Sequence, residues 1–130
     1  MFEIIIHTSK RNEMIDISSK VYKLIKENNL QNGILYLHVM HTTAAITINE
    51  NADNDVKIDL INALNSLVPN IKFYHYEGNS DAHLKTSLIG NSVNILIENG
   101  NPILGTWQGI YFCEFDGPRK RKVVAKFIKE

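Results

Sequence analysis

The chain has 130 residues, and its 14 lysines and arginines are balanced by 14 aspartates and glutamates. This length predicts a single domain over residues 1–130, and the zero net charge argues against a nucleic-acid partner, which would select a basic surface. The single cysteine, Cys113, excludes a disulfide within the chain and fits a reducing compartment. No apolar stretch approaches the ~20 residues that cross a bilayer, so we expect a cytoplasmic protein with no membrane partner.

The first half of the chain alternates between β-branched and helical patterns. Strands are expected at 2–8, 14–17, 34–40 and 45–49. A helix is expected from Ser18, as its N-cap, to about residue 28. A second helix fits residues 53–67, because apolar residues recur there on one face: Val56, Leu60, Leu64 and Leu67.

The second half of the chain is mainly strand-like. A short third helix is expected over residues 80–89, and strands are expected at 92–98, 103–107, 109–115 and 122–128. The turn sequences Asn99–Pro102 and Gly117-Pro118 indicate hairpins, and hairpins require antiparallel pairing. The sequence therefore predicts an α+β fold: one compact domain with a largely antiparallel or mixed β-sheet and two to three helices packed on it.

Three of the five histidines, His41, His75 and His83, fall where regular structure is expected to break or begin. Functional side chains gather at such positions. Neutral imidazole is a common zinc ligand, and three protein ligands with one open position are typical of a catalytic zinc site. The separations of 34 and 8 residues match no short metal motif. The pattern therefore leaves open either a metal site or three solvated or locally hydrogen-bonded histidines.

Polar residues follow the first of these histidines in two groups. Thr42 and Thr43 offer hydroxyls to an anion, and ordinary turn chemistry is the alternative. Asn49, Glu50 and Asp53 precede the second helix, where the carboxylates of Glu50 and Asp53 suit a cation, a metal-bound water or simple capping better than an anion.

The segment from Gly105 to Arg119 carries a further group of candidates. Two glycines flank the bulky Trp107, and glycine within a strand often marks a bulge or a close approach. Gln108 and Glu114 share a face with apolar residues, which fits either a ligand pocket or a half-exposed sheet face. Arg119 is able to bind a phosphate or carboxylate in bidentate fashion, and a solvated basic turn is the alternative.

Four blocks of the sequence carry a resemblance to a known family. They are HTTAAITINENAD (41–53), the loop with Tyr74 and His75, AHLKTSLIG (82–90) and LGTWQGIYFCEFDGPR (104–119). Together these blocks resemble the YjbQ-like proteins, also called the secondary thiamine-phosphate synthase enzyme family, over almost the whole chain. The resemblance implies a compact α+β domain that assembles as a homotrimer, with pockets near the subunit contacts.

The resemblance also implies a set of site residues. His41, His75 and His83 are expected to cluster and hold a divalent metal, zinc first by ligand type, with magnesium possible for a diphosphate substrate. Glu50 or Glu114 is expected to carry protons, and Arg119 to clamp the anion. Other polar residues of the same blocks are expected to contact the substrate: Thr42, Thr43, Asn49, Asp53, Thr106, Gln108 and Asp116.

The activity attached to this family joins hydroxymethylpyrimidine diphosphate to thiazole phosphate, giving thiamine phosphate and pyrophosphate. We therefore expect a transferase that acts on a phosphorylated small molecule, with this reaction as its main or its side activity. One alternative is a different metal-dependent, hydrolase-type reaction at the same three histidines. The other is a non-catalytic trimeric module that binds a small ligand or an anion.

Overall fold

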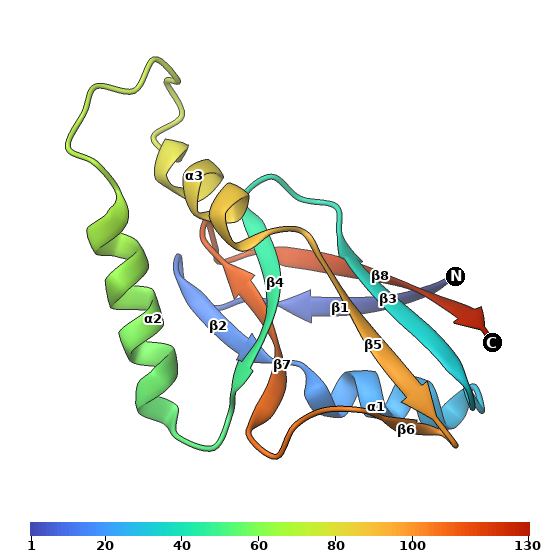
Figure 1. Ribbon diagram of the computed structural model, residues 1–130. Helices are drawn as coiled ribbons and strands as arrows, with labels where there is room; N and C mark the ends of the chain where they lie inside the picture. Colours follow the sequence, from blue (N-terminus) through green and yellow to red (C-terminus); the bar gives the residue numbers. More distant parts are fainter.

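Two antiparallel β-sheets and three helices make up the computed structural model, which describes residues 1–130 (Figure 1). The larger sheet has the strand order β1-β8-β3-β5-β6, and the smaller one has the order β2-β7-β4. This architecture confirms the α+β prediction. The elements are β1 (Phe2–His7), β2 (Glu13–Asp16), α1 (Ser18–Glu27), β3 (Gly33–Val39), β4 (Ala44–Glu50), α2 (Asn54–Leu67), α3 (Ser80–Ile89), β5 (Ser92–Glu98), β6 (Asn101–Pro102), β7 (Gln108–Glu114) and β8 (Lys120–Lys129).

The main core lies between the two sheets and is closed by α1. Leu35 and Leu37 of β3 point inward from the larger sheet, and Ile46 and Phe112 meet them from the smaller one. Val21 and its neighbours on α1 complete this cluster, in which the apolar positions of each strand alternate as a half-buried sheet requires.

A second, smaller core lies on the other face of the smaller sheet. Tyr111, Cys113 and Phe115 pack there against Ala82 of α3 and partly buried leucines of α2. Strand β7 is therefore buried on both faces, and burial raises the pKa of the Cys113 thiol to about 12. The thiol is an inert core group, as its aromatic surroundings in the sequence indicate.

Two local predictions are wrong. Residues 103–107 do not form a strand, because the Gly105 N–H donates to Oε1 of Gln108 and the Gln108 N–H donates to the Gly105 carbonyl, closing a tight turn. Ser18 does not cap α1 either. The N-cap is Ile17, while the Ser18 hydroxyl accepts a hydrogen bond from the backbone of Ile110 and joins the helix start to β7.

The helices differ in how deeply they are anchored. Asp53 caps α2 by accepting a hydrogen bond from the Asp55 N–H, yet no residue of α2 is buried, and Leu67 of the predicted apolar stripe is 63% exposed. None of the three helices combines the length and hydrophobicity needed to cross a membrane.

The pairing of β4 with β7 separates two ends of the smaller sheet. Ala44 lies opposite Glu114 at one end, and Glu50 lies opposite Gln108 at the other. Six residues along a strand span roughly 20 Å. Within one chain, side chains at these two ends of the strand pair therefore lie too far apart to line the same cavity.

Candidate functional site

A polar cavity of about 340 Å³ lies at the Ala44–Glu114 end of the smaller sheet. Its lining comes from three stretches of chain: the loop between β3 and β4, the start of α3 with the residues before it, and the segment from β7 into β8. The lining residues are Met40, His41, Thr42, Thr43, Glu77, Asn79, His83, Asp116, Arg119 and Arg121.

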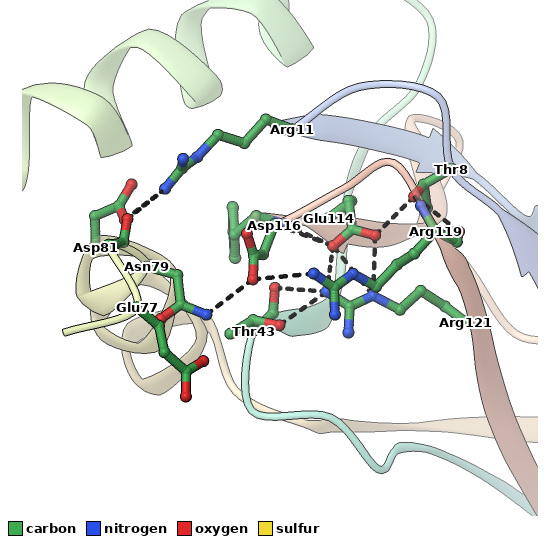
Figure 2. A network of polar contacts seen from close by, with 12 residues as sticks. Thr8, Arg11, Thr43, Glu77, Asn79, Asp81, Glu114, Asp116, Arg119 and Arg121 are labelled. Atoms are coloured by element: carbon green, nitrogen blue, oxygen red, sulfur yellow. Dashed lines mark hydrogen bonds and ion pairs between the residues drawn. The ribbon is translucent and has the colours of Figure 1, made fainter. Parts of the chain in front are cut away.

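A buried ion pair between Glu114 and Arg121 supports the floor of this cavity (Figure 2). The Arg121 Nε donates to both carboxylate oxygens at 2.9 and 3.1 Å, and its Nη2 donates to Oε2. The same Nη2 donates to the Thr43 hydroxyl at 2.8 Å and to the Thr43 carbonyl at 3.3 Å. The pair thereby connects β7, β8 and the loop before β4.

Glu114 also receives three hydrogen bonds besides those from Arg121. The Thr8 hydroxyl donates to Oε1 at 2.7 Å, and the backbone N–H groups of Phe115 and Asp116 donate to Oε2 at 3.1 Å. Burial alone would raise the pKa of Glu114, but these bonds and those from Arg121 outweigh it and hold the pKa below its usual value. With its oxygens occupied, the Glu114 side chain holds neighbouring groups in place, which does not favour its expected role as proton carrier.

The turn between β7 and β8 presents Asp116 and Arg119 at the rim of the cavity. Asp116 Oδ2 accepts hydrogen bonds from Asn79 Nδ2 at 2.9 Å and from Arg119 Nη2 at 3.2 Å. At Gly117 a Cβ atom would lie 2.2 Å from the Lys10 carbonyl oxygen, so only glycine fits there. This close approach brings the turn against the β1–β2 loop.

Helix α3, which carries His83, is fixed by the buried Lys85. Its ammonium donates to Oδ1 of Asn12 at 3.1 Å and to Oδ1 of Asn65 at 2.6 Å, and it lies 3.6 Å from Asp81. Burial lowers the pKa of Lys85, although Asp81 opposes that shift. These contacts set the position of His83 relative to the turn.

His41 is held by the backbone of β8. Its Nε2 accepts a hydrogen bond from the Lys122 N–H at 3.1 Å, so in the neutral ring we assign the proton to Nδ1. Burial lowers the pKa of His41, and the positive charge of Arg121 acts in the same direction. His41 is therefore a neutral imidazole at neutral pH, with one nitrogen already engaged.

The three predicted metal ligands are only partly brought together. The rings of His75 and His83 meet edge to face with centroids 5.4 Å apart, and His83 and His41 line the same cavity. No three His, Cys, Asp or Glu side chains converge closely enough to hold a metal ion. Because the Lys122 N–H already occupies Nε2 of His41, the donor set as placed does not fit a three-histidine zinc site.

A second group of predicted site residues lies at the opposite end of the β4–β7 pair. Glu50 and Gln108 pair there, Asn49 Oδ1 accepts from the Glu50 N–H at 2.7 Å, and Asp53 caps α2. Within one chain, these residues and Thr106 do not line the cavity. Six of the predicted site residues do line it: His41, His83, Thr42, Thr43, Asp116 and Arg119.

Four residues of the site are not predicted from the sequence: Arg121, Asn79 and Glu77, which line the cavity, and Thr8, which supports it. One signal was available for Arg121. It shares its parity along β8 with Val123 and Ala125, which are buried in the main core. A charged residue at an inward-facing strand position is expected only where a partner is buried with it.

The fold and this cavity define a small α+β domain with a polar cavity at one end of its smaller sheet. The family model for UPF0047 protein YjbQ-like matches residues 2–130, so the chain belongs to that family. This confirms the resemblance carried by the four sequence blocks.

Curated relatives and solved structures agree with this assignment. A UPF0047 protein of Methanocaldococcus jannaschii is 54% identical over 129 residues, covering 98% of this chain and 94% of its own. UPF0047 protein YugU of Bacillus subtilis is 49% identical, covering 95% of each chain. The crystal structure of a YjbQ/UPF0047 family protein from Clostridium acetobutylicum superposes with a TM-score of 0.94 at 50% identity, covering 98% of this chain and 100% of that one.

Replacing Glu114 with glutamine tests the role of the buried pair. We expect Glu114→Gln to lower the free energy of unfolding by about 3–5 kcal/mol, because it leaves the Arg121 charge buried without its partner. Glu3→Gln, which removes an exposed pair with Lys122, is the matched control and should cost less than about 1 kcal/mol. Urea unfolding at neutral pH measures both.

The loss of stability in Glu114→Gln is expected to depend on pH. The folded-state pKa of Glu114 is lower than the ordinary pKa of 4.5 for a glutamate. The ionised Glu114 therefore contributes fully to the stability of the fold above pH 4.5, and this contribution is lost as the pH falls through the folded-state pKa. The stability difference between the wild type and Glu114→Gln should therefore shrink only below pH 4.5. A difference that is absent at neutral pH would contradict the structural role of the pair.

Proposed function

We propose that the protein is an enzyme that acts on a phosphorylated small molecule in the cavity between His41 and Arg119, and that thiamine phosphate formation is its reaction. One observation carries this proposal. Three predicted site residues that are far apart in the sequence line one cavity: His41 of the first block, His83 of α3 and the anion clamp Arg119.

The cavity favours a phosphate group through directed donors. Arg119 and the Thr42 and Thr43 hydroxyls supply donors from different sides, and His41 carries one ring N–H. Charge-assisted hydrogen bonds to phosphate are about twice as strong as neutral ones. Such donors would also stabilise the negative charge that develops on departing pyrophosphate.

We expect the cavity residues to be required for thiamine phosphate formation from hydroxymethylpyrimidine diphosphate and thiazole phosphate. Arg119→Ala and His41→Ala should each lower kcat/KM by about 10- to 150-fold, since a hydrogen bond to a charged group contributes about 1.5–3 kcal/mol. Chromatographic quantification of thiamine phosphate gives the rates. Lys120→Ala and His7→Ala, which replace exposed neighbours outside the cavity, are the matched controls.

Two outcomes would refute this reaction. One is an absence of thiamine phosphate with wild-type protein, and the other is an unchanged rate in both cavity variants.

A second candidate is metal-dependent chemistry, including hydrolysis, with zinc at His41, His75 and His83. The contact between the rings of His75 and His83 favours it. The hydrogen bond that the Lys122 N–H donates to His41 Nε2 opposes it, and Glu50, the expected base, lies at the other end of β4.

Elemental analysis separates the two candidates. Because no three ligands converge, we expect purified protein to carry well under one equivalent of zinc. One full equivalent that is lost in His83→Ala and retained in His7→Ala would establish the zinc site instead. His7 is the matched control because it is exposed on β1 and lies outside the cavity.

We also infer that the protein acts as a homotrimer in which neighbouring copies lie near the pockets. Apolar side chains of α2 and the residues after it support this: Ile58 is 48% exposed, Leu67 63% and Ile71 61%. Ile58 lies on the opposite side of α2 from Leu67, so the apolar surface that a neighbouring copy would cover is the one formed by Leu67 and Ile71 at the end of the helix. A neighbouring copy would also offer a way to bring Glu50 and Gln108 to a cavity that their own chain does not let them reach.

Light scattering after gel filtration tests the assembly. We expect three times the 14.8 kDa mass of one chain for the wild type. Leu67→Glu should lower this mass, because it places an unpaired charge in an apolar contact, whereas Tyr22→Glu on α1 should not. A wild-type mass of one chain would exclude the trimer.

A further inference from the structure

Arg121 is the charged residue that is both buried and part of the cavity lining. Its side chain is 4% exposed, whereas Arg119 is half exposed. Burying a guanidinium is costly unless its donors are satisfied. The distribution of its hydrogen bonds therefore shows what each nitrogen is used for.

Two of the three guanidinium nitrogens are fully engaged within the protein. Nε donates to Glu114, and Nη2 donates to Glu114 and to both oxygens of Thr43. Nη1 makes no hydrogen bond to the protein. Nη1 is also not fully buried. The fully buried side-chain polar atoms that lack a hydrogen-bond partner belong to other residues, namely Asn79 Oδ1 and Thr86 Oγ1. Nη1 thus keeps N–H groups that no protein acceptor takes, on a residue that lines the cavity.

We propose that Arg121 is the fixed oxyanion-binding residue of the cavity, with its Nη1 donors binding a phosphate oxygen of the substrate while Glu114 holds the guanidinium in position. This inference rests on the proposed function and names the residue that recognises the phosphate. Glu114 is then a positioning residue. Arg119 is a second, less fixed contact, since its Nη2 is shared with Asp116 on an exposed turn.

The groups around Arg121 favour phosphate over carboxylate. The Thr43 hydroxyl accepts from Arg121, so its own proton is free to be donated. Arg121, Thr43 and Arg119 come from β8, the loop before β4 and the turn, and so they provide separate donors around one cavity. A phosphate monoester has three terminal oxygens for such donors, whereas a carboxylate has two.

The guanidinium is preorganised for this task. Its plane is fixed on one edge by the Glu114 carboxylate, so little side-chain freedom remains to be lost when a ligand binds. Lysine at this position would keep a positive charge but would lose the planar fork that contacts Glu114 and the ligand together. The substitution Arg121→Lys therefore separates charge from geometry.

Titration of ¹⁵N-labelled wild-type protein with inorganic phosphate tests the proposal directly. We expect the side-chain resonances of Arg121 to shift in a saturable manner. In Arg121→Lys the phosphate affinity should fall at least about tenfold, because a charged hydrogen bond is lost. Lys120→Ala, which replaces an exposed cation next to the turn, should bind phosphate as the wild type does.

The wild-type titration stays decisive if Arg121→Lys does not fold, because it needs no variant. Arg121 resonances that do not move while phosphate binds, or a wild type that does not bind phosphate, would overturn the proposal. Acetate that shifts Arg121 as strongly as phosphate at equal concentration would overturn the preference for phosphate. Arg121-dependent phosphate binding in a protein that forms no thiamine phosphate would support this inference and refute only the proposed reaction.

Discussion

The buried ion pair between Glu114 and Arg121 is the constraint on which the polar end of the molecule depends. Glu114 ends β7 in the smaller sheet, and Arg121 lies near the start of β8 in the larger one. The pair also bonds to Thr8, which follows β1, and to Thr43, which precedes β4. One interaction therefore ties the two sheets together at this end of the molecule and holds the loops that line the cavity.

The cost of burying this pair argues that it does more than stabilise the fold. Desolvating two charges is expensive, and apolar residues of similar volume often fill such a site with equal or greater stability. Two charges are useful here because Glu114 also binds the backbone of the turn through Asp116, and Arg121 retains a free nitrogen at the cavity. The same contacts that offset the burial thus shape the place where a ligand would bind.

Local sequence patterns account for most of the fold because strands and helices depend on nearby residues. The predicted helices at 53–67 and 80–89 match α2 and α3 closely, and the alternation of β7 correctly separates Phe112 from Cys113. The segment 103–107 was mispredicted because the hydrogen bonds between Gly105 and Gln108 outweigh its strand-like composition.

The site was less predictable from sequence because it depends on contacts between distant segments. His41, Thr43 and Arg119 were found from residue type and block, and they do share one cavity. Arg121 was missed because its partner Glu114 is fixed only by the meeting of two sheets. Glu50 was grouped with the cavity, yet the β4–β7 register places it at the far end of its strand.

The balance of charges in the whole chain is repeated around the cavity, and this narrows the class of ligand. The lining carries two carboxylates, Glu77 and Asp116, and two guanidinium groups, Arg119 and Arg121. A long polyanion gains affinity mainly from an excess of cations that releases counterions, and such an excess is absent where the lining holds as many carboxylates as guanidinium groups. A small phosphorylated molecule can instead be held by a few directed donors inside about 340 Å³. Local neutrality therefore favours recognition by geometry, and a fixed guanidinium is the group best suited to provide it.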